Sequence, residues 1–426
     1  MKRFSLKALV TAAALSVAVP AAAETVAIVN ARILTAGPAG EIANGTVVIR
    51  DGVIASVGQG GAPAGARVID AQGGVVTPGI VAADSGLGGV DVGAVGDDLS
   101  VTTSDLSAAF DVQYGLNPWS FTIPVARLGG VTRAIVTPGY DRAQGRELLF
   151  AGQAAVVHLG QGADMLVRPK AAMMLDLGEG GAARAGGARG ASFVALKAAL
   201  DDVRWYMRNR AAYDRGEARG LKLSRADLEA LVPVVEGRMP VIVSVHRAAD
   251  IQQVLKLARE ERLKVILDGA EEGWMVADQI ARAGVPVIVN PLSNLPGSFE
   301  SLGSTMENAA RLEKAGVTVI LKSQEGGVHR VRETRYNAGN AVAQGMSWEG
   351  ALKAITINPA RAFGMGDRFG SIEPGKEGDV VIWSGDPFEP LSQPVAVFVR
   401  GQQQPLTSRG LELRDRYRDL NARYGY

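Results

Sequence analysis

The chain has 426 residues, of which 47% are hydrophobic and 21% are charged, a balance typical of a globular protein with a large buried core. Its formal net charge is +1, which argues against nucleic acid or an anionic membrane surface as the main partner. It contains no cysteine, so disulfides and cysteine nucleophiles are excluded.

The start of the chain has the order of charge and hydropathy found in a secretory signal peptide. A basic beginning is followed by an apolar stretch over residues 8–20, which is too short to span a bilayer. The alanines at 21–23 then provide a small-residue cleavage site. We therefore expect residues 1–23 to be removed and the mature protein to be periplasmic or secreted, without membrane attachment.

Runs rich in Val and Ile, separated by turn residues, predict strands in the next part of the chain. They fall within residues 25–76, where Asp51-Gly52 is a strong hairpin signal. The same pattern returns only near the end, in the segment FGSIEPGKEGDVVIW that begins at Phe369. We therefore predict one small β-sandwich domain that is formed by the N-terminal and C-terminal segments together.

Between these segments, short apolar strands such as PVIVSVH, KVILDGA and VTVILKS alternate with amphipathic helical stretches that end at glycines. This repetition predicts an α/β fold, a (β/α)8 TIM-like barrel, and a doubly wound sheet is the alternative. The Gly/Ala/Arg-rich residues 178–192 are predicted to be a mobile loop over the barrel mouth or an unstructured spacer. The predicted boundaries are 24–77 and 366–407 for the small domain, 78–365 for the barrel and 408–426 for a helical tail.

Several motifs recur in a recognisable order along the chain. They are the paired runs NARILTA and DGVIASVG, then VIDAQGGVVTPGI, ITINPARAFG and GSIEPGKEGDVVIWSGDPFE. Together they resemble the amidohydrolase superfamily, specifically its exported imidazolonepropionase-like branch. The resemblance implies metal-assisted hydrolysis of C–N, non-peptide, bonds at the C-terminal ends of the barrel strands. There, histidines and carboxylates bind one or two divalent ions, and an aspartate on the last strand accepts a proton.

Most of the residues that this chemistry needs are replaced. The chain has three histidines, fewer than the four that binuclear members of the family use. In TPGIVAADSGLGG, an aspartate and a glycine stand at the family's His-x-His pair, and the last strand carries a glutamine, whose amide accepts no proton, instead of the catalytic aspartate. The fifth-strand histidine is retained as His246. The replaced positions are Asp84, Gly86, Gly269 or Ala270 on the sixth strand, and Gln324.

Two candidate metal ligands therefore remain, Asp84 and His246, although catalytic zinc usually takes three protein ligands and a water. Glu271 and His329 are candidates for substrate binding. Each residue also has a structural interpretation. Asp84 caps backbone amides, His246 hydrogen-bonds within the barrel mouth, Glu271 and Glu272 begin a helix, and His329 lies in a solvated loop.

Two functions follow from this pattern. The first is an amidohydrolase-family protein that has lost the metal-dependent reaction and needs no cofactor. It acts as a binding or partner subunit for a small molecule, or for an active relative within a homo-oligomer or hetero-oligomer. The alternative is an active hydrolase with an atypical mononuclear site, in which Asp84 and His246 bind one divalent metal, with zinc as the candidate.

Overall fold

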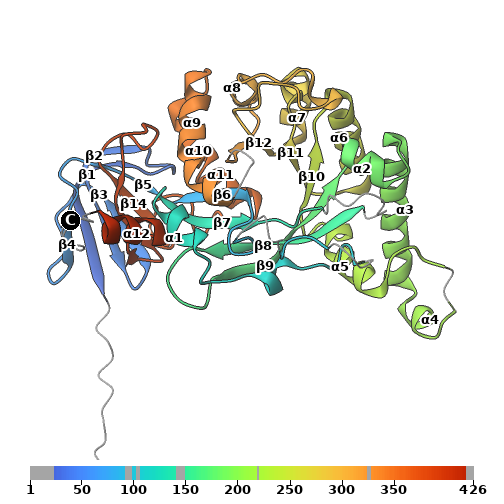
Figure 1. The fold of residues 1–426 in the computed structure, drawn as a ribbon, viewed down its shortest axis with the longest axis horizontal. Helices are drawn as coiled ribbons and strands as arrows, with labels where there is room; N and C mark the ends of the chain where they lie inside the picture. The colour runs from blue at the N-terminus through green and yellow to red at the C-terminus, as the bar shows by residue number, and fades with distance from the viewer. Residues whose placement is uncertain are drawn as a thin grey trace, which may run out of the picture.

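The computed structural model describes residues 24–91, 98–101, 106–140, 149–217, 220–323 and 328–418. The predicted signal peptide, Gln324 and the end of the predicted tail lie outside this part of the chain. The described residues form two eight-stranded sheets, one from the two ends of the chain and one from its centre (Figure 1).

The first sheet unites the N-terminal and C-terminal segments, as predicted. Its strand order is β16-β15-β14-β5-β1-β2-β3, and β4 pairs with β1. The predicted Asp51-Gly52 turn joins β2 to β3, and both residues have positive φ, as this tight hairpin requires. The strands are β1 (Thr25–Leu34), β2 (Glu41–Arg50), β3 (Val53–Gly58), β4 (Arg67–Asp70), β5 (Val75–Pro78), β14 (Val380–Trp383), β15 (Pro394–Val399) and β16 (Gln402–Gln404).

The second sheet is a nearly closed barrel, so the predicted TIM-like α/β fold is confirmed. Its order is β13-β12-β11-β10-β9-β8-β7-β6. Neighbours are parallel except for β8, which is antiparallel to both β7 and β9. The strands are β6 (Ile80–Ser85), β7 (Val131–Val136), β8 (Phe150–His158), β9 (Leu166–Asp176), β10 (Val241–Val245), β11 (Val265–Gly269), β12 (Val287–Val289) and β13 (Val319–Leu321).

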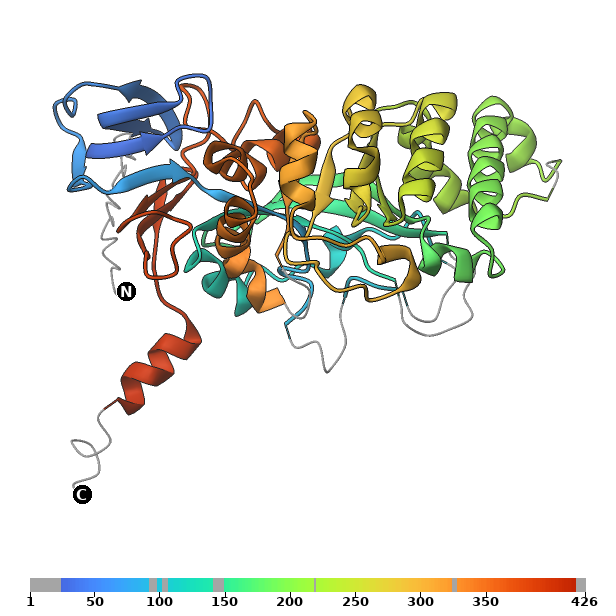
Figure 2. The same cartoon turned by 90° about the horizontal axis from the view of Figure 1, so that it is seen from above.

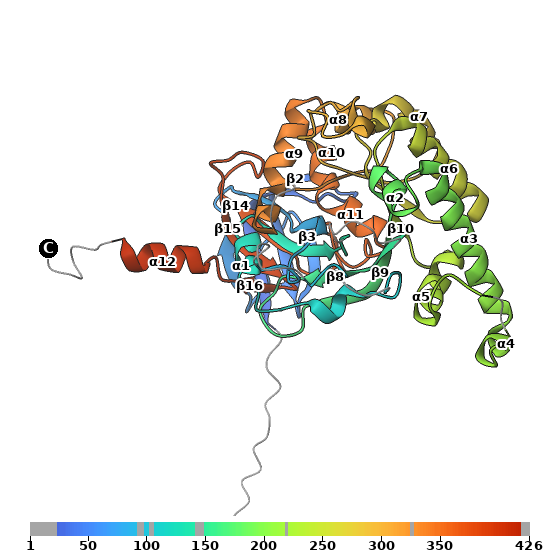
Figure 3. The ribbon, with the colours of Figure 1, turned by 45° about the vertical axis from the view of Figure 1, so that its right-hand side comes forward.

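Helices stand side by side along the barrel sheet, coloured green to orange in Figure 2. The described helices are α1 (Thr122–Arg127), α2 (Glu179–Arg184), α3 (Arg189–Arg208), α4 (Arg210–Asp214), α5 (Arg225–Val235), α6 (Ala248–Glu261), α7 (Ala277–Ala283), α8 (Asn308–Lys314), α9 (Thr334–Ala343), α10 (Trp348–Ala354), α11 (Ile357–Ala362) and α12 (Arg409–Tyr417). The final helix, α12, buries no residue and projects from the body (Figure 3). Within the described residues, we find no helix long and apolar enough to span a bilayer.

The prediction of a loop or spacer over residues 178–192 is wrong. This stretch forms α2 and the beginning of α3, separated by Gly186 and Gly187, which both have positive φ. Alanine and arginine are strong helix formers, and only the glycine pair breaks the helix. The segment is therefore ordered helical structure beside the barrel.

Candidate functional site

Charged side chains gather at the C-terminal ends of the barrel strands. Asp84 is near the end of β6 and Asp268 near the end of β11, while His246 and Lys322 directly follow β10 and β13. In a barrel of this kind the active site lies at this end of the strands. The structure therefore places the two predicted metal ligands at the expected end of the barrel, together with a lysine and a second aspartate.

Lys322 occupies the centre of this group. Its Nζ donates to Asp84 Oδ2 at 2.8 Å and to the two carboxylate oxygens of Asp268 at 2.9 and 3.2 Å. Thr137 donates from Oγ1 to the other oxygen of Asp84 at 2.7 Å. The side chains of Lys322 and Asp268 are only 8% and 7% exposed. One ammonium group therefore bridges two carboxylates in a largely dry environment.

The charges of this group depend on one another. Burial lowers the pKa of the Lys322 ammonium, but the charges and hydrogen bonds of Asp268 and Asp84 outweigh burial and raise that pKa well above its ordinary value. Burial raises the pKa of Asp268, and the nearby charge of Asp84 adds to the rise, against the opposing effect of Lys322. Lys322 is therefore a fixed cation at neutral pH.

His246 forms a second ion pair beside the first. Its Nδ1 lies 2.5 Å from Glu271 Oε2, and its Nε2 lies 3.4 Å from Ser244 Oγ and 3.8 Å from Glu300 Oε1. Burial lowers the pKa of the imidazole, but the hydrogen bond and charge of Glu271 and the charge of Glu300 raise it to about 9. A protonated imidazole donates from both nitrogens and has no lone pair for a metal.

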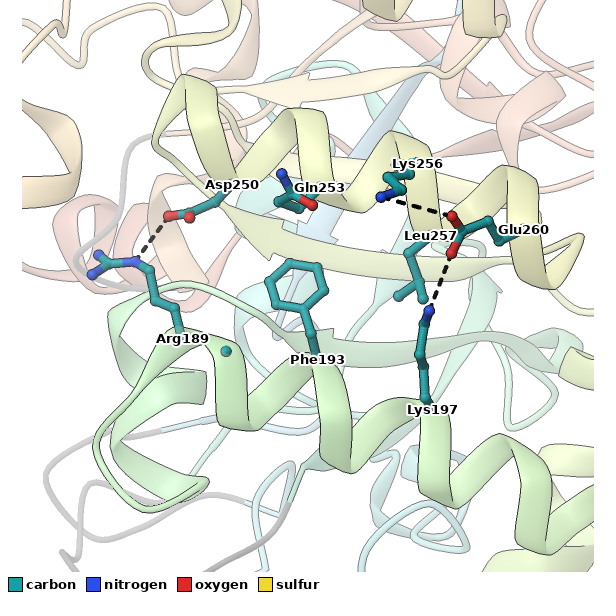
Figure 4. Close-up of a pocket in the computed structure, with 9 residues that line it drawn as sticks. Arg189, Phe193, Lys197, Asp250, Gln253, Lys256, Leu257 and Glu260 are labelled. Carbon is teal, nitrogen blue, oxygen red and sulfur yellow. Dashed lines mark hydrogen bonds and ion pairs between the residues drawn. The ribbon is translucent and has the colours of Figure 1, made fainter.

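Glu300 connects this pair to the outer helices. Its carboxylate accepts from the backbone N–H of Glu179 at 2.7 Å and from Arg189 Nη2 at 3.3 Å. Arg189 also donates through Nε to Asp250 on α6 at 2.8 Å, as Figure 4 shows. Two residues of the segment 178–192 thus hold an acid of the site in place. A small pocket of ≈ 300 Å³ lies between α3 and α6, and Arg189 and Asp250 are among the residues that line it (Figure 4).

The backbone at the strand ends has unusual conformations that direct these side chains. Asp84 has φ 51° and lies in an irregularity of the β6–β7 register between Ala82 and Ser85. Such an irregularity re-aims a side chain, and aspartate tolerates positive φ better than most residues. Ala270, with φ 46°, follows Gly269 in a sharp turn after β11. The local sequence thus turns both strand ends at the site.

The positions where the family resemblance expects further histidines leave little space for a side chain here. A Cβ at Gly86 would already lie 3.1–3.3 Å from side chains of Val328, Leu99 and Val90. At Gly269, a Cβ would lie 2.5 Å from the His246 ring. Neighbouring side chains therefore occupy the space that a larger side chain would need. At Gly86 these neighbours are apolar, and at Gly269 the neighbour is the ring of His246.

The remaining candidates have other places. Glu271 contacts His246, whereas Glu272 accepts from the backbone N–H groups of Ala248 and Gly303 and so supports loops. His329 lies in the 3-10 helix η4 (Val328–Glu333), and within the described residues no hydrogen bond or ion pair joins it to the charged group. Gln324, at the expected catalytic aspartate, lies outside the described residues.

The site does not fit a divalent ion. Across the described residues, no three His, Cys, Asp or Glu side chains are arranged to hold a metal. Asp84 is already bonded to Thr137 and Lys322, and His246 to Glu271. A cation that approached Asp84 would also meet the Lys322 ammonium, whose charge repels it. Asp84 is thus positioned to bind the Lys322 ammonium and not a metal ion.

Comparison with known proteins shows similarity to one family. The Amidohydrolase family model matches residues 227–410. A crystal structure of an amidohydrolase from Thermotoga maritima MSB8 has a TM-score of 0.79 and 26% identity, over 90% of this chain and 100% of that one. Amidohydrolase tasK of Hapsidospora irregularis is 25% identical over 84% of this chain and 40% of its own length. The chain is thus similar in sequence and in fold to members of the amidohydrolase superfamily.

Shorter and more distant matches agree with this similarity. An imidazolonepropionase of Porphyromonas gingivalis is 36% identical over 26% of this chain and 29% of its own length. An adenosine deaminase structure from Xanthomonas campestris with bound zinc shares the fold, with a TM-score of 0.50 and 19% identity over 93% of this chain and 99% of that one. Family members typically use a divalent metal, which the donor set described above does not accommodate.

Three residues of the charged group were not identified from the sequence: Lys322, Asp268 and Glu300. The first two carry a signal, because each is a charged residue at the end of an otherwise apolar strand, in VILKS and VILDG. Such residues are buried only with a partner, so each predicts a buried opposite charge without showing which residue supplies it. Glu300 lies in the short 3-10 helix η3 (Phe299–Ser301), and no local pattern marks it.

Proposed function

We propose that this protein is a non-hydrolytic member of the amidohydrolase superfamily, exported to the periplasm or secreted, which acts as a binding or partner subunit. The observation that carries the proposal is the position of Lys322, whose ammonium bridges Asp84 and Asp268 at the end of the barrel where the family resemblance places a metal. A lysine supplies the positive charge that balances the two acids, but it does not activate water as a Lewis acid.

The carboxylates of the site are also poor candidates for a general base. Asp84 and Asp268 are held by Lys322, and the pKa of Glu271 is lowered, because its bond to His246 outweighs the effect of burial. A general base typically contributes about 10²–10⁴-fold to a reaction rate. A donor set that does not fit a metal, together with carboxylates that are held in ion pairs, therefore supports binding without turnover, of a small molecule or an active relative.

Metal analysis of the purified mature protein tests the proposal directly. We expect less than a stoichiometric amount of zinc, manganese or iron by mass spectrometry, and no hydrolysis of dipeptides, cyclic amides or lactones with or without added metal. A tightly held equivalent of zinc that is lost in His246→Ala, together with turnover above buffer, would contradict it.

The alternative function is a hydrolase with one metal at Asp84 and His246. It is supported by the position of both residues at the C-terminal ends of barrel strands, β6 and β10. It requires Lys322 to leave Asp84, so added zinc would weaken the Asp84–Lys322 bond. Under this alternative, zinc-dependent turnover would disappear in both Asp84→Asn and His246→Ala, and would remain in the surface variant Lys256→Gln.

A further inference from the structure

A second cleft lies at the opposite end of the barrel from the charged site. Its volume is ≈ 480 Å³, and its lining includes Pro240, Lys264 and Pro286, which immediately precede β10, β11 and β12. The end of α11, from Arg361 to Gly364, forms another side. Ligand clefts in proteins usually measure about 300–1,000 Å³, so a small molecule fits this space.

The charge of this cleft is of one sign. Four basic residues line it, Arg168, Arg238, Lys264 and Arg361, and none of the described lining residues is Asp or Glu. The remainder of the lining is glycine, proline, aliphatic residues and Phe363. Charges of one sign that share a low-dielectric concave surface concentrate ions of the opposite sign there. The cleft therefore attracts anions, although the whole chain is nearly neutral.

The four cations differ in their carboxylate partners. Arg238 pairs with Glu236, and Arg361 lies close enough to Glu373 for their charges to interact. In the part of the chain that the structure describes, Arg168 and Lys264 form no ion pair with Asp or Glu. These two charges are therefore available to an anion in the cleft.

Two of the arginines are positioned by neighbouring glycines. Arg168 Nη1 donates to the carbonyl of Phe363 at 3.1 Å, and a Cβ on Gly364 would lie 3.0 Å from the same nitrogen. A Cβ on Gly366 would lie 2.5 Å from Cγ of Arg361. The glycines therefore make room for both side chains along the end of α11. Side chains that are held in this way lose less freedom when a ligand binds.

We propose that this cleft binds a small anion with at least two negative charges, of the phosphate or multicarboxylate type. Guanidinium groups match the geometry of phosphate and carboxylate oxygens through paired hydrogen bonds, and Lys264 adds a point charge. The cleft is separate from the barrel mouth, so the proposal does not depend on whether the protein hydrolyses anything. It adds a recognition site at the base of the barrel.

Isothermal titration calorimetry on the mature protein tests this site. Sodium pyrophosphate and sodium citrate are the two probes, with sodium chloride of equal ionic strength as the reference. We expect saturable binding of at least one probe, and at least about a tenfold weaker affinity in the triple variant Arg168→Gln, Lys264→Gln, Arg361→Gln. Tighter binding of pyrophosphate identifies phosphate as the ligand chemistry, and tighter binding of citrate identifies carboxylate.

A matched control separates a specific site from general charge attraction. Lys256→Gln removes an exposed positive charge from α6 outside this cleft, and its affinity should equal that of the unchanged protein. The single variant Lys264→Gln, judged folded by circular dichroism, replaces the triple variant if the latter does not fold. The proposal is overturned if neither probe binds, if the cleft variants bind as tightly as the unchanged protein, or if Lys256→Gln weakens binding as much as they do.

Discussion

At the scale of single residues, Lys322 controls the charge balance of the barrel mouth. Its ammonium is the cation that both Asp84 and Asp268 contact, and the three side chains are held together by direct bonds. Removing one partner of a buried pair leaves its counter-charges unpaired in a poorly hydrated place, which costs far more than losing an exposed pair. The same side chain keeps the two carboxylates from serving a metal.

We predict that Lys322→Met, which preserves most of the volume, lowers the free energy of unfolding by about 3–5 kcal/mol at neutral pH. The loss should shrink in acid, where the two carboxylates become protonated. Urea unfolding measures it, with Lys256→Met, a side chain that is 61% exposed, as a control that changes stability by less than about 0.5 kcal/mol. Equal losses in both variants would contradict the role of Lys322.

His246 makes stability depend on pH in a predictable direction. Its pKa is raised from the ordinary 6.5 to about 9, because Glu271 and Glu300 outweigh the opposing effect of burial. The imidazolium therefore contributes fully below pH 6.5, and its contribution is lost as the pH rises through about 9. The stability difference between the unchanged protein and His246→Gln should accordingly be larger near about pH 6 than near about pH 10.

His158 provides the comparison for this measurement. Burial and the charges of Arg133 and Arg400 lower its pKa, so no stabilising charge is lost between these two pH values. His158→Gln should show no decrease in its stability difference over the same interval. A difference for His246→Gln that stays constant with pH would show that folding does not raise the pKa of His246.

At the scale of elements, β14 is joined to the barrel by an unusually close approach. The ring of Trp383 lies against Gly130, which precedes β7, so that a Cβ on this glycine would lie 2.4 Å from the ring. Trp383 also donates from Nε1 to Thr77 Oγ1 at 2.8 Å and is almost completely buried. A tryptophan of the first sheet is thus part of the barrel core.

We predict that Gly130→Ala is more destabilising than Gly73→Ala. The two glycines have nearly the same positive φ, 79° and 80°, so both alanines carry the same conformational cost of about 1–2 kcal/mol. Only at Gly130 does the new methyl group meet Trp383, whereas a Cβ on Gly73 meets nothing within 4 Å. Overpacking should add about 1–3 kcal/mol. Thermal unfolding measures the difference, and equal losses would show that the contact yields freely.

The elements that the sequence predicts are those with local signals. The Asp51-Gly52 hairpin and the apolar strands β10, β11 and β13 follow directly from turn chemistry and apolar runs. The antiparallel direction of β8 was not predicted, because direction depends on pairing with β7 and β9 rather than on composition. The connection from β8 to β9, residues 159–165, contains no crossover helix, which permits this direction.

The site shows the same division between local and distant information. The positions of Asp84 and His246 at strand ends follow from the motifs, since both lie beside clear apolar strands. The partners of these residues come from far along the chain: Lys322 is 238 residues from Asp84, and Glu271 is 25 residues from His246. Without the fold, the charge of a residue says nothing about which opposite charge it meets.

At the scale of the whole molecule, the two ends of the chain form a sheet that is tied to the barrel by a buried ion-pair group. Arg133 on β7 is completely buried, and its guanidinium contacts Asp379, just before β14, and Glu377. The bond from Nη2 to Glu377 is 2.6 Å, and the guanidinium also lies 4.7 Å from the centre of the Phe369 ring. Because Trp383 and Arg133 both cross this boundary, the two sheets should unfold together.

We predict a single unfolding transition for the protein, with tryptophan fluorescence and far-ultraviolet circular dichroism changing together in urea. Arg133→Met should lower the free energy of unfolding by about 3–5 kcal/mol, because Asp379 and Glu377 lose a buried partner. Arg32→Met is the matched control. Arg32 forms an ion pair with Glu41, and the side chain of Arg32 is 53% exposed. Loss of this ion pair should cost less than about 1 kcal/mol. Separate transitions in the unchanged protein, or equal costs for both variants, would show that the sheets are only weakly coupled.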